Sequence, residues 1–220
     1  MILPANDEGV WVASIATSGQ KKNLHLIKID KDANLIFDQI YERPLGISEK
    51  VKDVTGLVEL ANGQVAVAFT AELDNLGHSL QGNLVSNNAL HFRNLGYNPF
   101  RTDTEHTHFK QFVKDQSSGY YVVGVSDTAD GPQIIRLDEQ FQVDWSKKLD
   151  PFQKYCNSSH VTLSIAPAAG SGVQVLLRNH LSTGDWDTYL AQISSDGMRQ
   201  WARKVNFSTD LAGTEVLDIE

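Results

Sequence analysis

Imidazole and carboxylate side chains recur in this sequence at nearly equal spacing, each directly before an apolar residue that opens a β-rich run. The four positions are Asp53, His108, His160 and Glu215, separated by 55, 52 and 55 residues. Nitrogen and oxygen ligands together suit a divalent transition metal such as zinc. His106, two residues before His108, adds a fifth ligand on the same side. The spacing predicts one divalent metal bound by these side chains; the alternative is a polar ring that hydrogen-bonds to itself and to water.

A second group of residues has the chemistry of a binding site. Asp185, Trp186 and Asp187 place an aromatic ring between two carboxylates, an arrangement that a sugar ring or a cationic ligand would contact. Arg101 and Tyr155 add a cation and a second ring to the same predicted rim. We expect these five residues to bind a ligand. The alternative is that Trp186 folds back as a lid over its own strands.

Signatures of nucleophilic catalysis are absent from the sequence. No G-x-S-x-G elbow, phosphate-binding loop or kinase motif occurs. Cys156, the single cysteine, lies near His160 in sequence, but a polar run follows it directly, which is typical of an ordinary thiol. No catalytic residue is therefore assigned.

Two independent markers show that the elements positioning these residues are repeated four times. A glycine before an apolar run recurs with steps of 54, 56 and 53 residues, and a late aromatic residue recurs with steps of 55, 53 and 56. The glycines are Gly9, Gly63, Gly119 and Gly172, and the aromatic residues are Phe37, Phe92, Trp145 and Trp201.

Each repeat predicts four short strands, because runs of β-branched and aromatic residues alternate with turn residues. In the third repeat the predicted strands are 108–113, 120–126, 133–138 and 142–149. Several of the second strands are apolar at consecutive positions and must be covered on both faces. The prediction is an all-β fold: a four-bladed β-propeller of four-stranded antiparallel sheets.

The ends of the sequence predict how such a ring would close. Residues 214–219 have the pattern of a first strand, but no second, third or fourth strand follows them. At the other end of the sequence, the first glycine, Gly9, precedes the second strand of a repeat. We therefore expect 214–219 to pair beside 10–14 as the innermost strand of the first blade, in a single domain covering 1–220. The alternative is a part of a larger propeller cut at blade boundaries. The predicted blades are 9–42 with 214–219, 53–96, 108–150 and 160–206.

The third repeat, GYYVVGVSDTADGPQIIRLDEQFQVDWSKKL, resembles the repeats of bacterial β-propeller proteins. Those repeats follow a pattern of glycine, hydrophobic strand, turn, hydrophobic strand and D-x-x-G-x-x-x-W. The resemblance covers the whole chain, with departures: the second repeat has Phe92 in place of tryptophan, and only Asp196-Gly197 keeps the Asp-Gly turn. In blade number alone the chain is similar to hemopexin-like propellers, so the resemblance implies a fold and assigns no residue a role.

Composition excludes several classes of partner. The 220 residues carry a formal charge of −8 and 41% hydrophobic residues, which fits a globular domain and disfavours nucleic acid or an anionic membrane. No apolar run reaches the ~18 residues of a membrane span, and the first residues lack the pattern of a signal peptide. We expect a soluble protein, compatible with export from a bacterial cell.

Two functions remain open at this point. The first is a non-catalytic module that binds a ligand or protein on the face with the long loops and at the mouth of the central channel, with a divalent metal on the axis. The second is a metal-assisted hydrolase or lyase with its centre at that mouth. A bound metal with an open coordination position would favour the enzyme.

Overall fold

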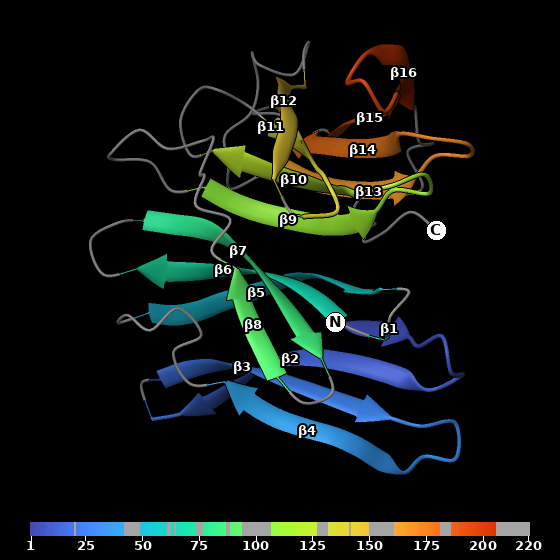
Figure 1. Ribbon diagram of the computed structural model, residues 1–220. Helices are drawn as coiled ribbons and strands as arrows, with labels where there is room; N and C mark the ends of the chain where they lie inside the picture. The colour runs from blue at the N-terminus through green and yellow to red at the C-terminus, as the bar shows by residue number, and fades with distance from the viewer. Residues whose placement is uncertain are drawn as a thin grey trace. The chain divides into compact units, whose positions relative to one another are not determined.

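The computed structural model describes the chain as two units, Met1–Thr104 and Glu105–Glu220, which we treat separately. The described residues are 1–19, 21–41, 49–60, 63, 65–73, 77–86, 89–93, 107–126, 132–140, 142–149, 161–180 and 186–205. Every regular element among them is a β-strand (Figure 1). No helix in this part of the chain is long and apolar enough to cross a membrane.

The first unit contains two sheets, each an antiparallel meander of four strands that follow one another in sequence. The first sheet is formed by β1 (Ile2–Pro4), β2 (Val10–Ser18), β3 (Lys21–Ile29) and β4 (Leu35–Tyr41). The second is formed by β5 (Glu49–Glu59), β6 (Val65–Leu73), β7 (Gly77–Ser86) and β8 (Ala89–Arg93).

The second unit repeats this arrangement (Figure 1). Its first sheet is formed by β9 (Thr107–Lys114), β10 (Tyr120–Ser126), β11 (Pro132–Leu137) and β12 (Val143–Lys148). Its second is formed by β13 (Val161–Pro167), β14 (Val173–His180), β15 (Trp186–Ile193) and β16 (Arg199–Val205). The predicted four-strand repeat is therefore confirmed in all four sheets.

Consecutive apolar residues are buried on both faces in β6 and β10, as expected, whereas buried and half-buried residues alternate at the start of β2. Residues 65–69 of β6 are all buried, and so are residues 120–123 of β10. Their side chains point alternately to the two faces of a sheet, so each of these sheets has apolar packing on both sides. One core cluster in each unit joins its two sheets: Trp11 and Phe69 belong to the first, and Tyr121 and Ile165 to the second.

The repeated glycine is explained by a close approach between backbones. A Cβ atom on Gly9, Gly119 or Gly172 would lie 2.4, 2.3 or 2.2 Å from the carbonyl oxygen that ends the third strand of the same sheet. Gly119 and Gly172 also have positive φ angles of 78° and 91°. Gly63 differs, because it lies two residues before β6 and has open space around it. The glycine marker thus fixes the turn before the second strand in three of the four sheets.

Three of the four aromatic markers occupy equivalent positions in the fourth strands. Phe37 pairs with Lys28, Trp145 with Arg136 and Trp201 with Gln192, and a bulge follows each pair at the end of the third strand. In the second sheet the pairing continues without a bulge, so His91 holds the equivalent position and Phe92 is displaced by one residue. The predicted equivalence of Phe92 is therefore wrong in register.

Trp145 packs between the two sheets of the second unit. Its indole Nε1 donates to the Ser195 carbonyl at 2.9 Å, and its ring packs against the core cluster of that unit. Gln111 of β9 also joins the two sheets, because its Oε1 accepts from the Ile165 amide at 2.6 Å and from the Ser164 hydroxyl at 3.0 Å. The role of Trp145 is structural, as its place in the repeat predicted.

The innermost strand of the first sheet differs from the prediction. β1 pairs with β2 in the register Ile2↔Val12 to Pro4↔Val10, and it occupies the edge that we assigned to 214–219. The reason is a tight local hairpin, in which the Ala5 amide donates to the Gly9 carbonyl at 2.9 Å. Local pairing loses less chain entropy than pairing across the whole sequence. Residues 214–219 themselves lie outside the described residues.

Candidate functional site

Most of the side chains predicted to form the two sites lie outside the described part of the chain. His108 and Trp186 have described backbones, in β9 and β15, but not described side chains. Asp53 and Asp187 are described completely. The predicted site residues outside the described ranges are Arg101, His106, Tyr155, His160, Asp185 and Glu215.

Strand register supports part of the predicted metal-binding set. Asp53 pairs with Thr70 and His108 with Val125, and both partners lie five residues after the start of the second strand, so the two positions are equivalent. In the fourth sheet Thr162 holds that position, opposite Arg178. His160 is therefore offset by two residues. Bulges account for one of these two residues: counted from the turn before the second strand, Asp53 and His108 each lie beyond one bulge, whereas β13 pairs without a bulge.

Asp53 is exposed, and its neighbour Val54 packs against the core of the first unit. Among the residues described here, no cluster of three or more His, Cys, Asp or Glu side chains could hold a metal ion.

Asp187 lies beside a cation and a phenol on the last two strands. Its carboxylate forms an ion pair with Lys204 of β16, and the Tyr189 hydroxyl donates to Asp187 Oδ2 at 3.4 Å. The hydrogen bond with Asp187 raises the pKa of the Lys204 ammonium, which therefore stays charged at neutral pH. Asp187 and Lys204 thus offset each other's charge at this end of β16.

A hollow of about 490 Å³ extends along β16 next to this pair. It is lined by Tyr189 and by the whole run from Arg199 to Lys204. The two aromatic rings carry cations: the Arg203 guanidinium lies 5.8 Å from the Trp201 ring centre, and Lys204 Nζ lies 5.9 Å from that of Tyr189. Arg203 and Lys204 are neighbours on a strand, so their side chains leave it on opposite faces.

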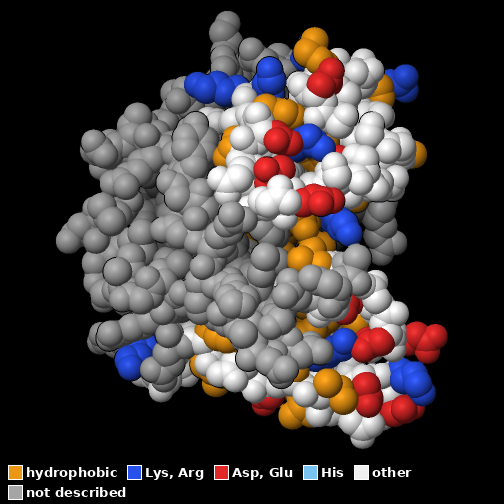
Figure 2. All heavy atoms as spheres, viewed as in Figure 1, with side chains coloured by type: hydrophobic (Ala, Val, Ile, Leu, Met, Phe, Trp, Pro, Cys, Tyr) orange, Lys and Arg blue, Asp and Glu red, His pale blue; other side chains and the backbone are white. Residues whose placement is uncertain are grey.

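A second, more apolar hollow of about 350 Å³ adjoins the first, because Arg199 lines both. Its floor contains Ile134, Leu149 and Ile193, which are buried. Lys147 and Lys148 of β12 stand at its rim together with Met198, whose side chain is 60% exposed. We call the two hollows together the cationic groove. Lys and Arg side chains show at the top of the view in Figure 2, in the region of β12 and β16.

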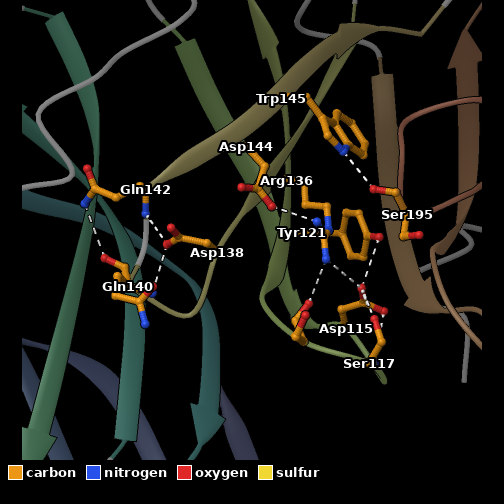
Figure 3. A network of polar contacts seen from close by, with 11 residues as sticks. Asp115, Ser117, Tyr121, Arg136, Asp138, Gln140, Gln142, Asp144, Trp145 and Ser195 are labelled. Carbon is orange, nitrogen blue, oxygen red and sulfur yellow. Dashed lines mark hydrogen bonds and ion pairs between the residues drawn. The ribbon is translucent and has the colours of Figure 1, made fainter.

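A buried ionic network lies at the end of β11 and the start of β12 (Figure 3). The carboxylate of Asp115 is fully buried and lies 3.5 Å from Arg136 Nη2, while Arg136 Nη1 contacts Asp144 at 2.7 Å. The Tyr121 hydroxyl donates to Asp115 at 3.3 Å, and burial raises the pKa of Tyr121 to about 12. Each group of this network binds another, so its role is to hold the turn at 115–119 against β11.

The first unit has a counterpart at the equivalent positions. Lys28 replaces Arg136 and lies 5.1 Å from the ring centre of Trp11, which replaces Tyr121. Its ammonium contacts Asp7 at 2.7 Å and Glu59 at 3.8 Å. The hydrogen bond from Lys28 lowers the pKa of the Asp7 carboxyl. The cations at this position are therefore held by carboxylates in both units.

The sequence analysis missed the cationic groove, although a signal for it is present. The strand RQWARKV carries three cations in seven residues of a chain with a net charge of −8, and only its tryptophan was used, as a repeat marker. The apolar floor was hidden, because its residues come from β11, β15 and the end of β12.

Comparisons with known proteins give little beyond the fold. No family model matches the sequence, and no curated protein matches it. A protein of unknown function from Dyadobacter fermentans DSM 18053 has a similar structure, with a TM-score of 0.56 and 10% identity over 85% of this chain and 50% of that one. The catalytic domain of a GH62 α-L-arabinofuranosidase from Coprinopsis cinerea gives a TM-score of 0.49 and 10% identity over 90% and 65%. The chain thus spans half of the first protein and 65% of the second, and the first likeness concerns the fold alone.

Proposed function

We propose that this chain is a non-catalytic binding module that holds an anionic ligand in the cationic groove of the second unit. The observation that carries the proposal is the concentration of five cations, Lys147, Lys148, Arg199, Arg203 and Lys204, along two adjoining hollows, the second of which has an apolar floor. Asp187 pairs with Lys204 beside the first hollow, but none of the described residues that line the two hollows is acidic. A chain with 27 acidic and 19 basic residues has no general excess of cations to explain such a group. Apolar contact would supply affinity, and the cations would select for negative charge.

Ligand binding can be tested with simple polyanions. We expect poly-L-glutamate and polygalacturonate to bind the full chain at low salt, as measured by isothermal titration calorimetry. Arg199→Gln with Arg203→Gln should weaken binding roughly tenfold or more, because each exposed ion pair contributes up to ~1 kcal/mol. Lys31→Gln, which removes an exposed cation of the first unit, is the matched control and should bind as the unmodified protein does. Equal binding by the double variant and the control would refute the assignment of the groove.

We also propose the four-bladed propeller as the architecture of the module. It is supported by the four consecutive meanders, by the repeated glycine turns and by the burial of second strands on both faces. A compact ring of 220 residues should have a radius of gyration of about 17 Å in X-ray scattering.

In such a ring the inner-strand residues Asp53, His108, His160 and Glu215, with His106, would bind a divalent metal at the channel mouth. The equivalent register of Asp53 and His108 supports part of this set. We expect added zinc to raise the melting temperature, and His108→Ala with His160→Ala to abolish the rise. A metal-free protein whose melting temperature is unaffected by zinc, nickel, manganese or calcium would exclude the metal site.

A further inference from the structure

We propose that the ligand of the cationic groove is an extended acidic peptide that pairs with β16 as a fifth strand. This inference rests on the proposed binding function and names its ligand class. Among the described residues β16 is the last strand of its sheet, with β15 as its neighbour on one side. The other side of an edge strand presents backbone N–H and C=O groups in a row, which can pair with an incoming strand.

The side chains beside this edge favour an acidic partner. Arg199, Arg203 and Lys204 all line the hollow along β16. Arg203 and Lys204 point to opposite faces of the strand. Acidic residues on one face of an added strand would meet Arg203, whereas Lys204 on the other face is already paired with Asp187. The Arg203 side chain stacks on Trp201 and the Lys204 side chain on Tyr189. Both cations are therefore ordered before a ligand binds, which lowers the conformational entropy lost on binding.

The same contacts disfavour a sugar chain as the ligand. Sugar rings bind by stacking on open aromatic faces, but Arg203 lies over the Trp201 ring and Lys204 over that of Tyr189. The Trp201 Nε1 also donates to Gln192 at 3.0 Å and is not aimed at a ligand. The groove therefore presents cationic side chains and the backbone N–H and C=O groups of an edge strand. A peptide can pair with both kinds of group better than a polysaccharide can.

Charged edge strands often serve only to prevent aggregation, and the adjoining apolar hollow argues against that role here. Protection needs charge alone, whereas the floor formed by Ile134, Leu149 and Ile193 offers about 350 Å³ beside the start of β16. An apolar side chain of a bound peptide would fill this space. The partner we expect thus alternates acidic and apolar residues.

The test uses the full chain and a capped hexapeptide, Glu-Val-Glu-Ile-Glu-Val. We expect binding at low salt, with amide shift changes confined to residues 199–205 and their neighbours in a nitrogen-15 NMR spectrum. The same peptide with every backbone amide N-methylated keeps its charge and loses its donors, so its Kd should rise at least tenfold. Arg203→Gln should raise the Kd roughly fivefold. Lys31→Gln should leave it unchanged, and thermal melting checks that both variants fold.

The outcomes separate this inference from the proposed function. Equal binding of the N-methylated peptide, or binding of polygalacturonate without the hexapeptide, would overturn strand addition and leave the binding function intact. Concentration-dependent sedimentation of the free protein that Arg203→Gln abolishes would also overturn it, because a second copy would then be the partner. Failure of every anionic probe to bind would overturn both.

Discussion

Replacing Gly172 by Ala is expected to lower the free energy of unfolding by about 3 kcal/mol or more, measured by urea denaturation. Two separate costs add at this position. The φ angle of 91° is unfavourable for any residue with a Cβ atom, at about 1–2 kcal/mol. The new Cβ would also lie 2.2 Å from the Ile193 carbonyl oxygen and 2.9 Å from the Ser194 Cα, so the turn and the third strand would have to separate.

Gly170 provides a matched control for the cost of the positive φ angle. Its φ angle is 92°, almost the same as that of Gly172, but no atom lies within 4 Å of a Cβ added there. Gly170→Ala should therefore cost only about 1–2 kcal/mol. Gly119→Ala, with a predicted Cβ distance of 2.3 Å, should resemble Gly172→Ala. If Gly170→Ala and Gly172→Ala destabilise the protein equally, the close approach is not the reason for the repeated glycine.

Replacing Arg136 by Met is expected to cost about 3–5 kcal/mol, because it removes the cation from a buried carboxylate. Asp115 has no exposed side-chain surface, and after the substitution it would keep only uncharged donors, the Ser117 amide and the hydroxyls of Ser117 and Tyr121. Urea denaturation at neutral pH measures the loss. Asp144→Ala, which removes the half-exposed partner of the same arginine, should cost under ~1 kcal/mol.

The double variant Asp115→Ala with Arg136→Gln is the test of the mechanism. It copies the fourth sheet, where Ala168 and Gln192 hold the equivalent positions. We expect it to be more stable than Arg136→Met, because no buried charge is left without a partner. A double variant as unstable as Arg136→Met would show that the loss comes from packing of the arginine and not from the charge of Asp115.

The repeat was predictable from the sequence because its markers are local. Two residues leave signals at a fixed spacing: the glycine that lies close to a carbonyl oxygen, and the aromatic residue that pairs with the third strand. The strands 120–126 and 142–149 were predicted close to their observed bounds. Burial of consecutive apolar residues, as in β6 and β10, was also readable from residue type alone.

Register was harder to predict, because bulges add residues that a count along the chain does not reveal. The bulges of β5 and β9, which β13 lacks, account for one of the two residues by which His160 departs from the row of Asp53 and His108. The missing bulge between β7 and β8 likewise displaces Phe92. β1 was missed because three residues are too short to give a β pattern. The cationic groove was missed because its apolar floor combines residues of the β11–β12 hairpin with Ile193 of β15, more than 40 residues later in the sequence.

In three of the four sheets the position that pairs with the fourth-strand aromatic residue is polar, and each of the three is filled differently. Lys28 contacts Asp7 and Glu59, Arg136 contacts Asp115 and Asp144, and Gln192 binds Trp201. Repeated sequences risk exchanging equivalent strands while they fold. A strand carrying Arg136 that entered the fourth sheet would meet Ala168 instead of a carboxylate and would bury an unpaired charge. The differences between the repeats thus favour assembly of each hairpin with its own neighbours, and a chain made of four identical copies of one repeat would lack this protection against misassembly.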